Sequence, residues 1–158
     1  MRARTLLFLA VLATLMGCSS KRITSKSSIY YERTACYGTC PIYDMTIRGN
    51  GLVTLNGNRF TEKIGQWKLQ LTKEETRTLF NAVQDIRWDT LKPKYDSGVS
   101  DFPSTILSIN HRKMADTVVI TGVHIPSLDS SFAHLNQLVK GHSDRWKQVG
   151  TAADPVYH

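Results

Sequence analysis

The sequence predicts an α+β fold in which two helices pack on one side of an antiparallel sheet. Residues 42–48 alternate strictly between apolar and polar side chains, which is typical of a half-buried strand. Residues 76–86 and 128–139 instead carry apolar side chains at helical spacing. Turns rich in glycine and asparagine separate the short extended segments. The predicted order is four strands, a helix, two strands and a second helix.

The first half of the domain is predicted to be an antiparallel meander. Tyr43, Met45 and Ile47 lie on one face of the alternating strand, and polar side chains lie on the other. Four stretches have the composition or alternation of strands: 28–34, 42–48, 52–55 and 67–71. Two hairpin turns are predicted within this region, at residues 49–51 and 56–58.

The second half begins with a capping-box signature, in which Thr72 is the N-cap and Glu75 answers it. The helix that follows is expected to end near Trp88, and a loop with two prolines covers residues 89–103. Strands are predicted at 105–110 and 117–121, and Pro126 suits the first turn of a closing helix that ends by Gly141. The apolar positions of the two helices are Thr76, Leu79, Phe80, Val83, Ile86, Leu128, Phe132, Leu135 and Val139.

The N-terminus has the pattern of a bacterial lipoprotein signal. Arg2 and Arg4 precede an apolar run at residues 5–17, which ends in Leu15-Met16-Gly17-Cys18. The run has 13 residues, whereas a membrane-spanning helix needs about 20. We therefore expect a signal peptide at 1–17 and lipidation of Cys18. A flexible tether at 18–28, a single domain at 29–147 and a loosely ordered tail at 148–158 complete the predicted organisation.

Lipidation predicts a location in the bacterial cell envelope. Several acyl chains on Cys18 would anchor the protein firmly to a membrane, and Ser19 favours the outer membrane over the inner one. The net charge is +7, but the basic residues are scattered and do not form a stripe with stacking aromatics, so nucleic-acid binding is not expected. The predicted partners are the membrane and an unidentified envelope protein or glycan.

Two cysteines remain once Cys18 is assigned to lipid. Cys36 and Cys40 flank Gly38, and in an oxidising compartment such a pair is most simply a disulfide. The alternative is thiol-redox or copper chemistry at the C-x-x-x-C-P string, with His111 or His124 as a third copper ligand.

The same loop carries a resemblance to a known family. The string Cys36-Tyr37-Gly38-Thr39-Cys40-Pro41, followed by Tyr43, and the later Asp101-Phe102-Pro103 resemble a bacterial family of domains of unknown function that is common in secreted lipoproteins. The likeness covers about residues 29–139. It implies the fold and leaves the activity open.

The sequence lacks the usual signatures of an enzyme. It contains no G-x-S-x-G, H-E-x-x-H or glycine-rich phosphate loop, so we predict no catalytic residues, metal ligands or cofactor. Asp96 and Asp101 in the long loop are the remaining binding candidates, and the alternative is that both form side-chain-to-backbone turns. The function expected is a non-catalytic binding module on a lipid anchor, with metal or thiol-redox handling as the alternative.

Overall fold

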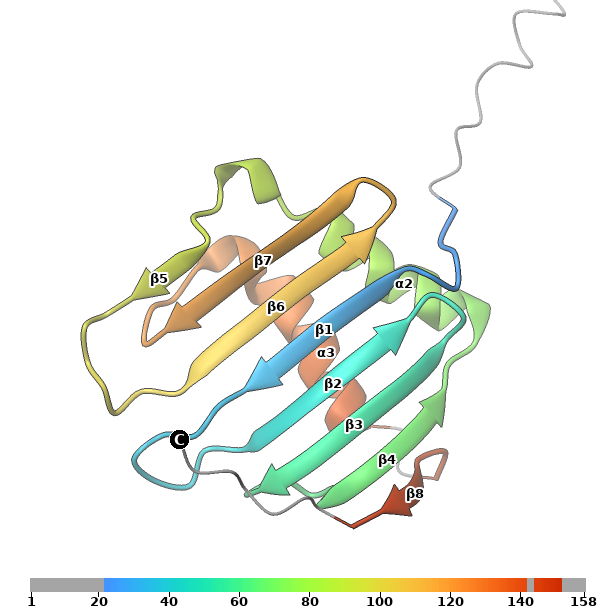
Figure 1. Ribbon diagram of the computed structural model, residues 1–158, viewed down its shortest axis with the longest axis horizontal. Helices are drawn as coiled ribbons and strands as arrows, with labels where there is room; N and C mark the ends of the chain where they lie inside the picture. Colours follow the sequence, from blue (N-terminus) through green and yellow to red (C-terminus); the bar gives the residue numbers. More distant parts are fainter. Residues whose placement is uncertain (1–21, 142–143, 152–158) are drawn as a thin grey trace, which may run out of the picture.

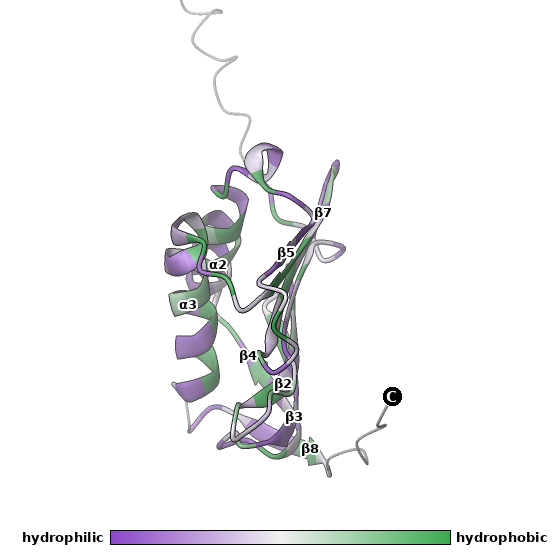
Figure 2. Cartoon of the chain, turned by 90° about the vertical axis from the view of Figure 1, so that its left-hand side faces the viewer, coloured by the Kyte–Doolittle hydropathy of each residue, from purple (hydrophilic) through white to green (hydrophobic). Residues whose placement is uncertain are grey.

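Eight strands form one sheet, and two helices cover one of its faces (Figures 1 and 2). The computed structural model describes residues 22–141 and 144–151. The strand order is β5-β7-β6-β1-β2-β3-β4-β8. The strands are β1 Ser28–Arg33, β2 Ile42–Arg48, β3 Leu52–Arg59, β4 Gly65–Gln70, β5 Lys94–Asp96, β6 Ser104–His111, β7 Met114–Thr121 and β8 Lys147–Gly150. The helices are α2 Lys73–Gln84 and α3 Asp129–Lys140, with short 3-10 turns at Trp88–Thr90 and Pro126–Leu128.

The α+β class and the two helices on one side are confirmed, but the sheet is mixed and not purely antiparallel. β5 pairs in parallel with β7, within the stretch for which a loop is predicted. β8 pairs with β4 at residues for which a loose tail is predicted. Each of these strands has only three or four residues, which is too short for an alternating pattern to stand out.

The second predicted hairpin turn is wrong, because β3 continues through residues 56–58 to Arg59. Gly57 lies inside the strand, where the backbone of Lys63 crosses close above it. A Cβ atom at this position would overlap the Lys63 carbonyl group. The glycine therefore permits a close approach of two backbone segments and does not form a turn.

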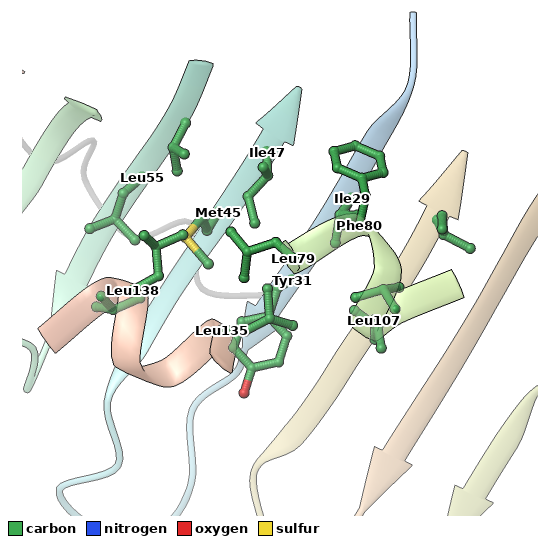
Figure 3. Close-up of a cluster of buried hydrophobic side chains, with 14 of the residues drawn as sticks. Ile29, Tyr31, Met45, Ile47, Leu55, Leu79, Phe80, Leu107, Leu135 and Leu138 are labelled. Carbon is green, nitrogen blue, oxygen red and sulfur yellow. The ribbon is translucent and has the colours of Figure 1, made fainter. Parts of the chain in front are cut away.

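The core lies between the sheet and the helices (Figure 3). Alternate residues of β1, β2 and β6 point toward α2 and α3, as the predicted alternation requires. The predicted apolar face of α2 is also the buried one. Among the largest fully buried side chains are Ile29, Tyr31, Met45, Ile47, Phe80, Leu107 and Leu135. No helix in the described ranges is long and apolar enough to cross a membrane.

The chain is packed against the domain before β1 begins. Ile23 contacts the core, and Ser27 is buried with its hydroxyl oxygen 2.8 Å from Nδ1 of His111. Burial lowers the pKa of His111, and the nearby Arg112 adds to that shift. Residues 23–28 are thus part of the folded domain, although a flexible tether is predicted to reach residue 28. The predicted signal peptide and Cys18 lie outside the described residues.

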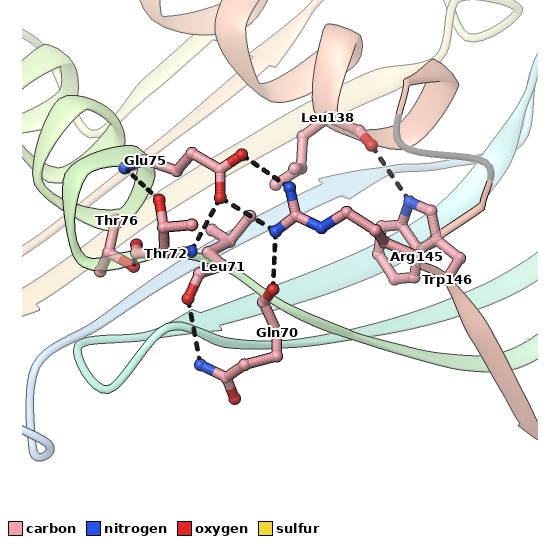
Figure 4. A network of polar contacts seen from close by, with 8 residues as sticks. All are labelled: Gln70, Leu71, Thr72, Glu75, Thr76, Leu138, Arg145 and Trp146. Atoms are coloured by element: carbon pink, nitrogen blue, oxygen red, sulfur yellow. Dashed lines mark hydrogen bonds and ion pairs between the residues drawn. The ribbon is translucent and has the colours of Figure 1, made fainter.

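An ion pair joins the C-terminal segment to the start of α2 (Figure 4). Arg145 donates to both carboxylate oxygens of Glu75, at 2.8 and 3.0 Å, and to the carbonyl of Gln70. The capping box predicted at Thr72 is present, because the Thr72 N–H donates to Glu75 and the Glu75 N–H donates to the Thr72 hydroxyl. The bonds from Arg145 and Thr72 lower the pKa of Glu75 to about 2.

We expect Glu75→Gln to weaken the protein at neutral pH and to cost progressively less in acid. The folded pKa lies below the ordinary value of 4.5, so the stabilisation is present above pH 4.5 and is lost as the pH falls toward 2. Because the pair is about one-third exposed, we expect a loss of about 1 kcal/mol at pH 7. Urea unfolding of native protein and variant at pH 7, 4 and 2.5 measures the difference. Glu74→Gln, which removes the same charge one residue away, is the control, and a pH-independent difference for Glu75 would contradict the prediction.

Candidate functional site

Four connections gather at one end of the sheet, the end at which β1 finishes (Figure 1). We call this the loop end; it comprises residues 34–41, 60–64, 97–103 and 122–125. The opposite, N-terminal end carries residues 22–27 and the tight turns at 49–51 and 112–113. The two motifs that carry the family resemblance both belong to the loop end.

The cysteine loop is a tight structure held against the rest of the loop end. The sulfur atoms of Cys36 and Cys40 lie at disulfide-bonding distance, with Cα atoms 5.8 Å apart. Gly38 has a φ of +151°, which favours glycine, and its N–H donates to the Cys36 carbonyl. The Tyr37 N–H donates to the carbonyl of Asp101 at 3.1 Å, which joins the two motifs.

The two candidate aspartates make local bonds. Asp96 pairs with Lys94 and accepts a hydrogen bond from the Gly98 N–H at 2.9 Å. Both contacts lower the pKa of Asp96, and the contact with Lys94 has the larger effect. Asp101 accepts from the hydroxyl of its neighbour Ser100 at 3.3 Å. Asp96 thus forms the side-chain-to-backbone turn that the alternative predicts. Asp101 contributes its backbone carbonyl to the cysteine loop.

A cavity of about 240 Å³ lies between the cysteine loop, the β3–β4 connection and the C-terminal half of α3. We call it the α3 cavity. Arg33 lies at the end of β1, and Tyr43 lies near the start of β2. Lys140 and Glu62 are exposed at its rim. The polar side chains that line it are those of Arg33, Tyr43, Thr61, Glu62, Asn136 and Lys140.

A hydrogen-bonded trio, which we call the floor, consists of Tyr43 and Asn136, which line the α3 cavity, and of the fully buried Tyr31. The hydroxyl groups of Tyr31 and Tyr43 both donate to Oδ1 of Asn136, at 3.1 and 2.9 Å. Burial raises the pKa of both phenols, so the two hydroxyls remain protonated donors at neutral pH. Because both donate to the same oxygen, the Asn136 amide oxygen is fixed toward the sheet.

Arg33 has a buried donor with no acceptor. Its Nε atom is shielded from solvent and has no hydrogen-bond partner within the described residues. Burial raises the pKa values of the Tyr31 and Tyr43 phenols, and the Arg33 charge acts against that rise at both, aided at Tyr31 by a side-chain hydrogen bond with Arg33. A buried, unsatisfied donor on a charged group costs more than about 1–3 kcal/mol. This is the unmet polar group at the loop end.

The residues of the metal or redox alternative do not come together. His111 is on the last residue of β6 at the N-terminal end, far along the strand from the cysteine loop. His124 bonds the Asp129 carboxylate at 2.9 and 3.0 Å. Strand β2, and no helix, follows the cysteines, so no helix N-terminus lowers a thiol pKa here. The described ranges contain no group of three His, Cys, Asp or Glu side chains able to hold a metal.

A carboxylate pair lies on the open face of the sheet. Glu32 and Asp44 are directly opposite in the β1–β2 register. The Tyr30 hydroxyl donates to Glu32 at 2.6 Å, and Asn56 donates to Asp44 at 3.2 Å. Burial, with a smaller effect of Glu32, raises the pKa of Asp44. Such a like-charge pair is destabilising on its own, and the two donors offset part of that cost.

Arg33, Asn136 and Lys140 are not among the site residues predicted from the sequence. One feature of the sequence indicates Arg33. As an alternate residue after Ile29 and Tyr31 it belongs to the same face of the strand, and a cation on a buried face needs a polar partner. Asn136 gave a weaker signal, because it is an amide directly beside the apolar stripe of the closing helix. Only the fold brings these residues to one cavity.

The comparison with known families matches the span expected from the motifs. The family model described as a domain of unknown function, DUF6438, matches residues 27–139. No curated protein matches the sequence significantly. The match includes both motifs and every residue lining the α3 cavity except Lys140.

Proposed function

The chain belongs to the DUF6438 family of domains of unknown function, and from that premise we propose that it is a lipid-anchored, non-catalytic binding module of a bacterial cell envelope. The lipoprotein part of the proposal rests on the signal pattern that ends at Cys18. Its membrane partner is the lipid bilayer, held through acyl chains on Cys18, with the outer membrane favoured by Ser19.

One observation supports the binding part: the loop end and the start of the described chain lie at opposite ends of the sheet (Figure 1). Ile23 already contacts the core, and the five residue-to-residue steps from Cys18 to Ile23 span at most about 18 Å. An eight-residue strand such as β6 adds about 25 Å in the other direction. A lipid at Cys18 would therefore hold the domain near the membrane with its loop end directed away from it.

The loop end has the surface of a protein-binding site. Tyr37 is 91% exposed, and Phe60 and Phe102 are each about half exposed. Aromatic side chains are enriched at the centres of protein interfaces, where they supply most of the binding energy. We therefore propose an envelope protein as the partner of this end. A glycan partner is the other outcome that the experiment below can give.

The cysteine pair is assigned a structural role in this proposal. A disulfide that closes so short a loop contributes about 2 kcal/mol, and it would keep Tyr37 and the Asp101 loop in place. The copper and thiol-redox alternative would need a reduced pair with further ligands or a lowered thiol pKa, and no contact of the described residues favours it.

Photocrosslinking in intact cells tests the proposal. We expect Tyr37→p-benzoylphenylalanine to give one discrete protein adduct, because the side chain lies at the outer surface of the loop end. The same replacement at the exposed Arg77 on α2 is the control and should give no such adduct. Equal adducts from both positions, or none from Tyr37, would contradict a binding role for the loop end. An adduct that resists protease and is removed by glycosidase would replace the protein partner by a glycan.

A further inference from the structure

We propose that the α3 cavity binds a monocarboxylate that carries an apolar group, with the Arg33 guanidinium as its anchor. The inference rests on the proposed binding function and names a ligand class for that function. Arg33 lines this cavity, and its Nε–H is buried without a hydrogen-bond acceptor among the described residues. A guanidinium group offers parallel N–H donors that fit the two oxygens of a carboxylate.

Two further groups complete an anion site. The phenols of Tyr31 and Tyr43 both donate to the Asn136 side-chain oxygen. The Asn136 side-chain nitrogen has no hydrogen-bond acceptor among the described residues. Lys140 adds a second positive charge at the rim. A carboxylate between Arg33 and Asn136 would accept hydrogen bonds from the guanidinium group and from the Asn136 amide nitrogen, both of which belong to residues that line the cavity.

The charges favour a monoanion. Arg33 and Lys140 contribute two positive charges and Glu62 contributes one negative charge, so the lining carries a net charge of +1. A carboxylate balances this charge. A phosphate dianion would exceed it and would also meet repulsion from Glu62.

The remaining walls are apolar, and the cavity is small. Pro41, Phe60 and Val139 face the space beside the polar groups. Phe60 holds a φ of +55°, a costly conformation for a bulky residue, and it remains half exposed at the cavity mouth. A volume of about 240 Å³ is below the usual range for drug-sized ligands. The apolar group is therefore of about the size of one side chain.

Two sources share this chemistry: a free small acid and the C-terminal carboxylate of a peptide. The probes that separate them are 3-phenylpropionate for the free acid and N-acetylphenylalanine for the chain terminus. The corresponding amides have the same shape without the charge, and phenyl phosphate carries the alternative anion. Binding is measured by isothermal titration calorimetry on the full-length protein in the neutral detergent dodecyl maltoside.

We expect at least one of the two carboxylates to bind. Its amide should bind at least about tenfold more weakly, since the amide lacks the negative charge that strengthens the hydrogen bonds from Arg33. Arg33→Gln should lower the affinity for the carboxylate by at least about tenfold. Arg77→Gln removes the same charge from the exposed surface of α2 and should leave the affinity within about twofold. Thermal unfolding of each variant shows that it is folded.

Asn136→Asp is the second variant and keeps the floor intact. The aspartate retains an oxygen for the two phenols, but it adds a negative charge beside Arg33. We expect this variant to fold and to lose carboxylate binding. Retained binding in Asn136→Asp or Arg33→Gln would overturn the assignment of the site.

The other outcomes are equally decisive. No binding of either carboxylate at millimolar concentration, equal binding of the amides, or tighter binding of phenyl phosphate would each overturn the inference. Binding of N-acetylphenylalanine alone would identify the C-terminus of a peptide chain as the ligand. Binding of 3-phenylpropionate alone would identify a free small acid as the ligand. None of these results changes the Tyr37 adduct or the membrane attachment, so failure of the inference is distinguishable from failure of the proposed function.

Discussion

Loss of the Cys18 thiol is expected to release the protein from the membrane. The proposed lipidation requires that sulfur, because the acyl chains that would anchor the protein are attached through it. The triple variant Leu15→Ala, Gly17→Ala, Cys18→Ala also creates an ordinary A-x-A cleavage site, so that the signal is removed and does not itself retain the protein. We expect the membrane-bound share to fall from nearly all to background.

Fractionation after a carbonate wash measures the share, and metabolic labelling with an alkyne fatty acid reports the lipid. The matched control is the double variant Cys36→Ala, Cys40→Ala, which removes two other cysteines and should keep both the label and the membrane attachment. A triple variant that stays in the membrane fraction would contradict the lipoprotein assignment. Label on the double variant but not on the triple variant would place the lipid on Cys18.

Phe80→Ala is expected to be the most damaging single core substitution, with a loss of about 3–5 kcal/mol in the free energy of unfolding. Phe80 is fully buried in α2, and its ring meets the edge of the His111 ring with centroids 6.2 Å apart. Figure 3 shows it among the buried side chains that α2 and the sheet enclose. Because a domain of this kind has about 5–15 kcal/mol in total, the variant would retain only part of its stability.

Urea unfolding followed by circular dichroism measures this loss. Thr78→Ala changes an exposed residue of the same helix and should stay within about 0.5 kcal/mol of the native protein. Phe80→Leu keeps most of the apolar volume and should fall between the two. A loss below about 1 kcal/mol for Phe80→Ala would mean that α2 does not pack on the sheet as described.

The parts of the fold that the sequence predicts well depend on neighbouring residues. The strand at 42–48 has the bounds that its alternation indicates, because side chains two apart share a face of any strand. The Thr72–Glu75 capping box is correct because all its atoms lie within one helical turn. The Cys36–Cys40 pair needs only a tight turn at Gly38 to bring its sulfur atoms to bonding distance.

The parts that only the tertiary structure decides depend on residues far apart in the chain. β5 is stabilised as a strand by its pairing with β7, about 25 positions later in the chain. β8 is stabilised by its pairing with β4, about 80 positions earlier. Residues 56–58 have the composition of a turn, but the pairing of Gly57 with Tyr43 of β2 and Gly65 of β4 makes it part of a strand. In each case the partner that stabilises the conformation is absent from the local sequence.

The same division holds for the candidate site. The sequence by itself predicts lipidation at Cys18 and contains the cysteine loop, each within a short run of residues, and the family match extends over residues 27–139. The α3 cavity joins Arg33 of β1, Tyr43 of β2 and Asn136 of α3, which span more than 100 positions. Their hydrogen bonds and the unmet Arg33 donor arise only when the helix packs on the sheet, because packing removes the water that would otherwise satisfy these groups.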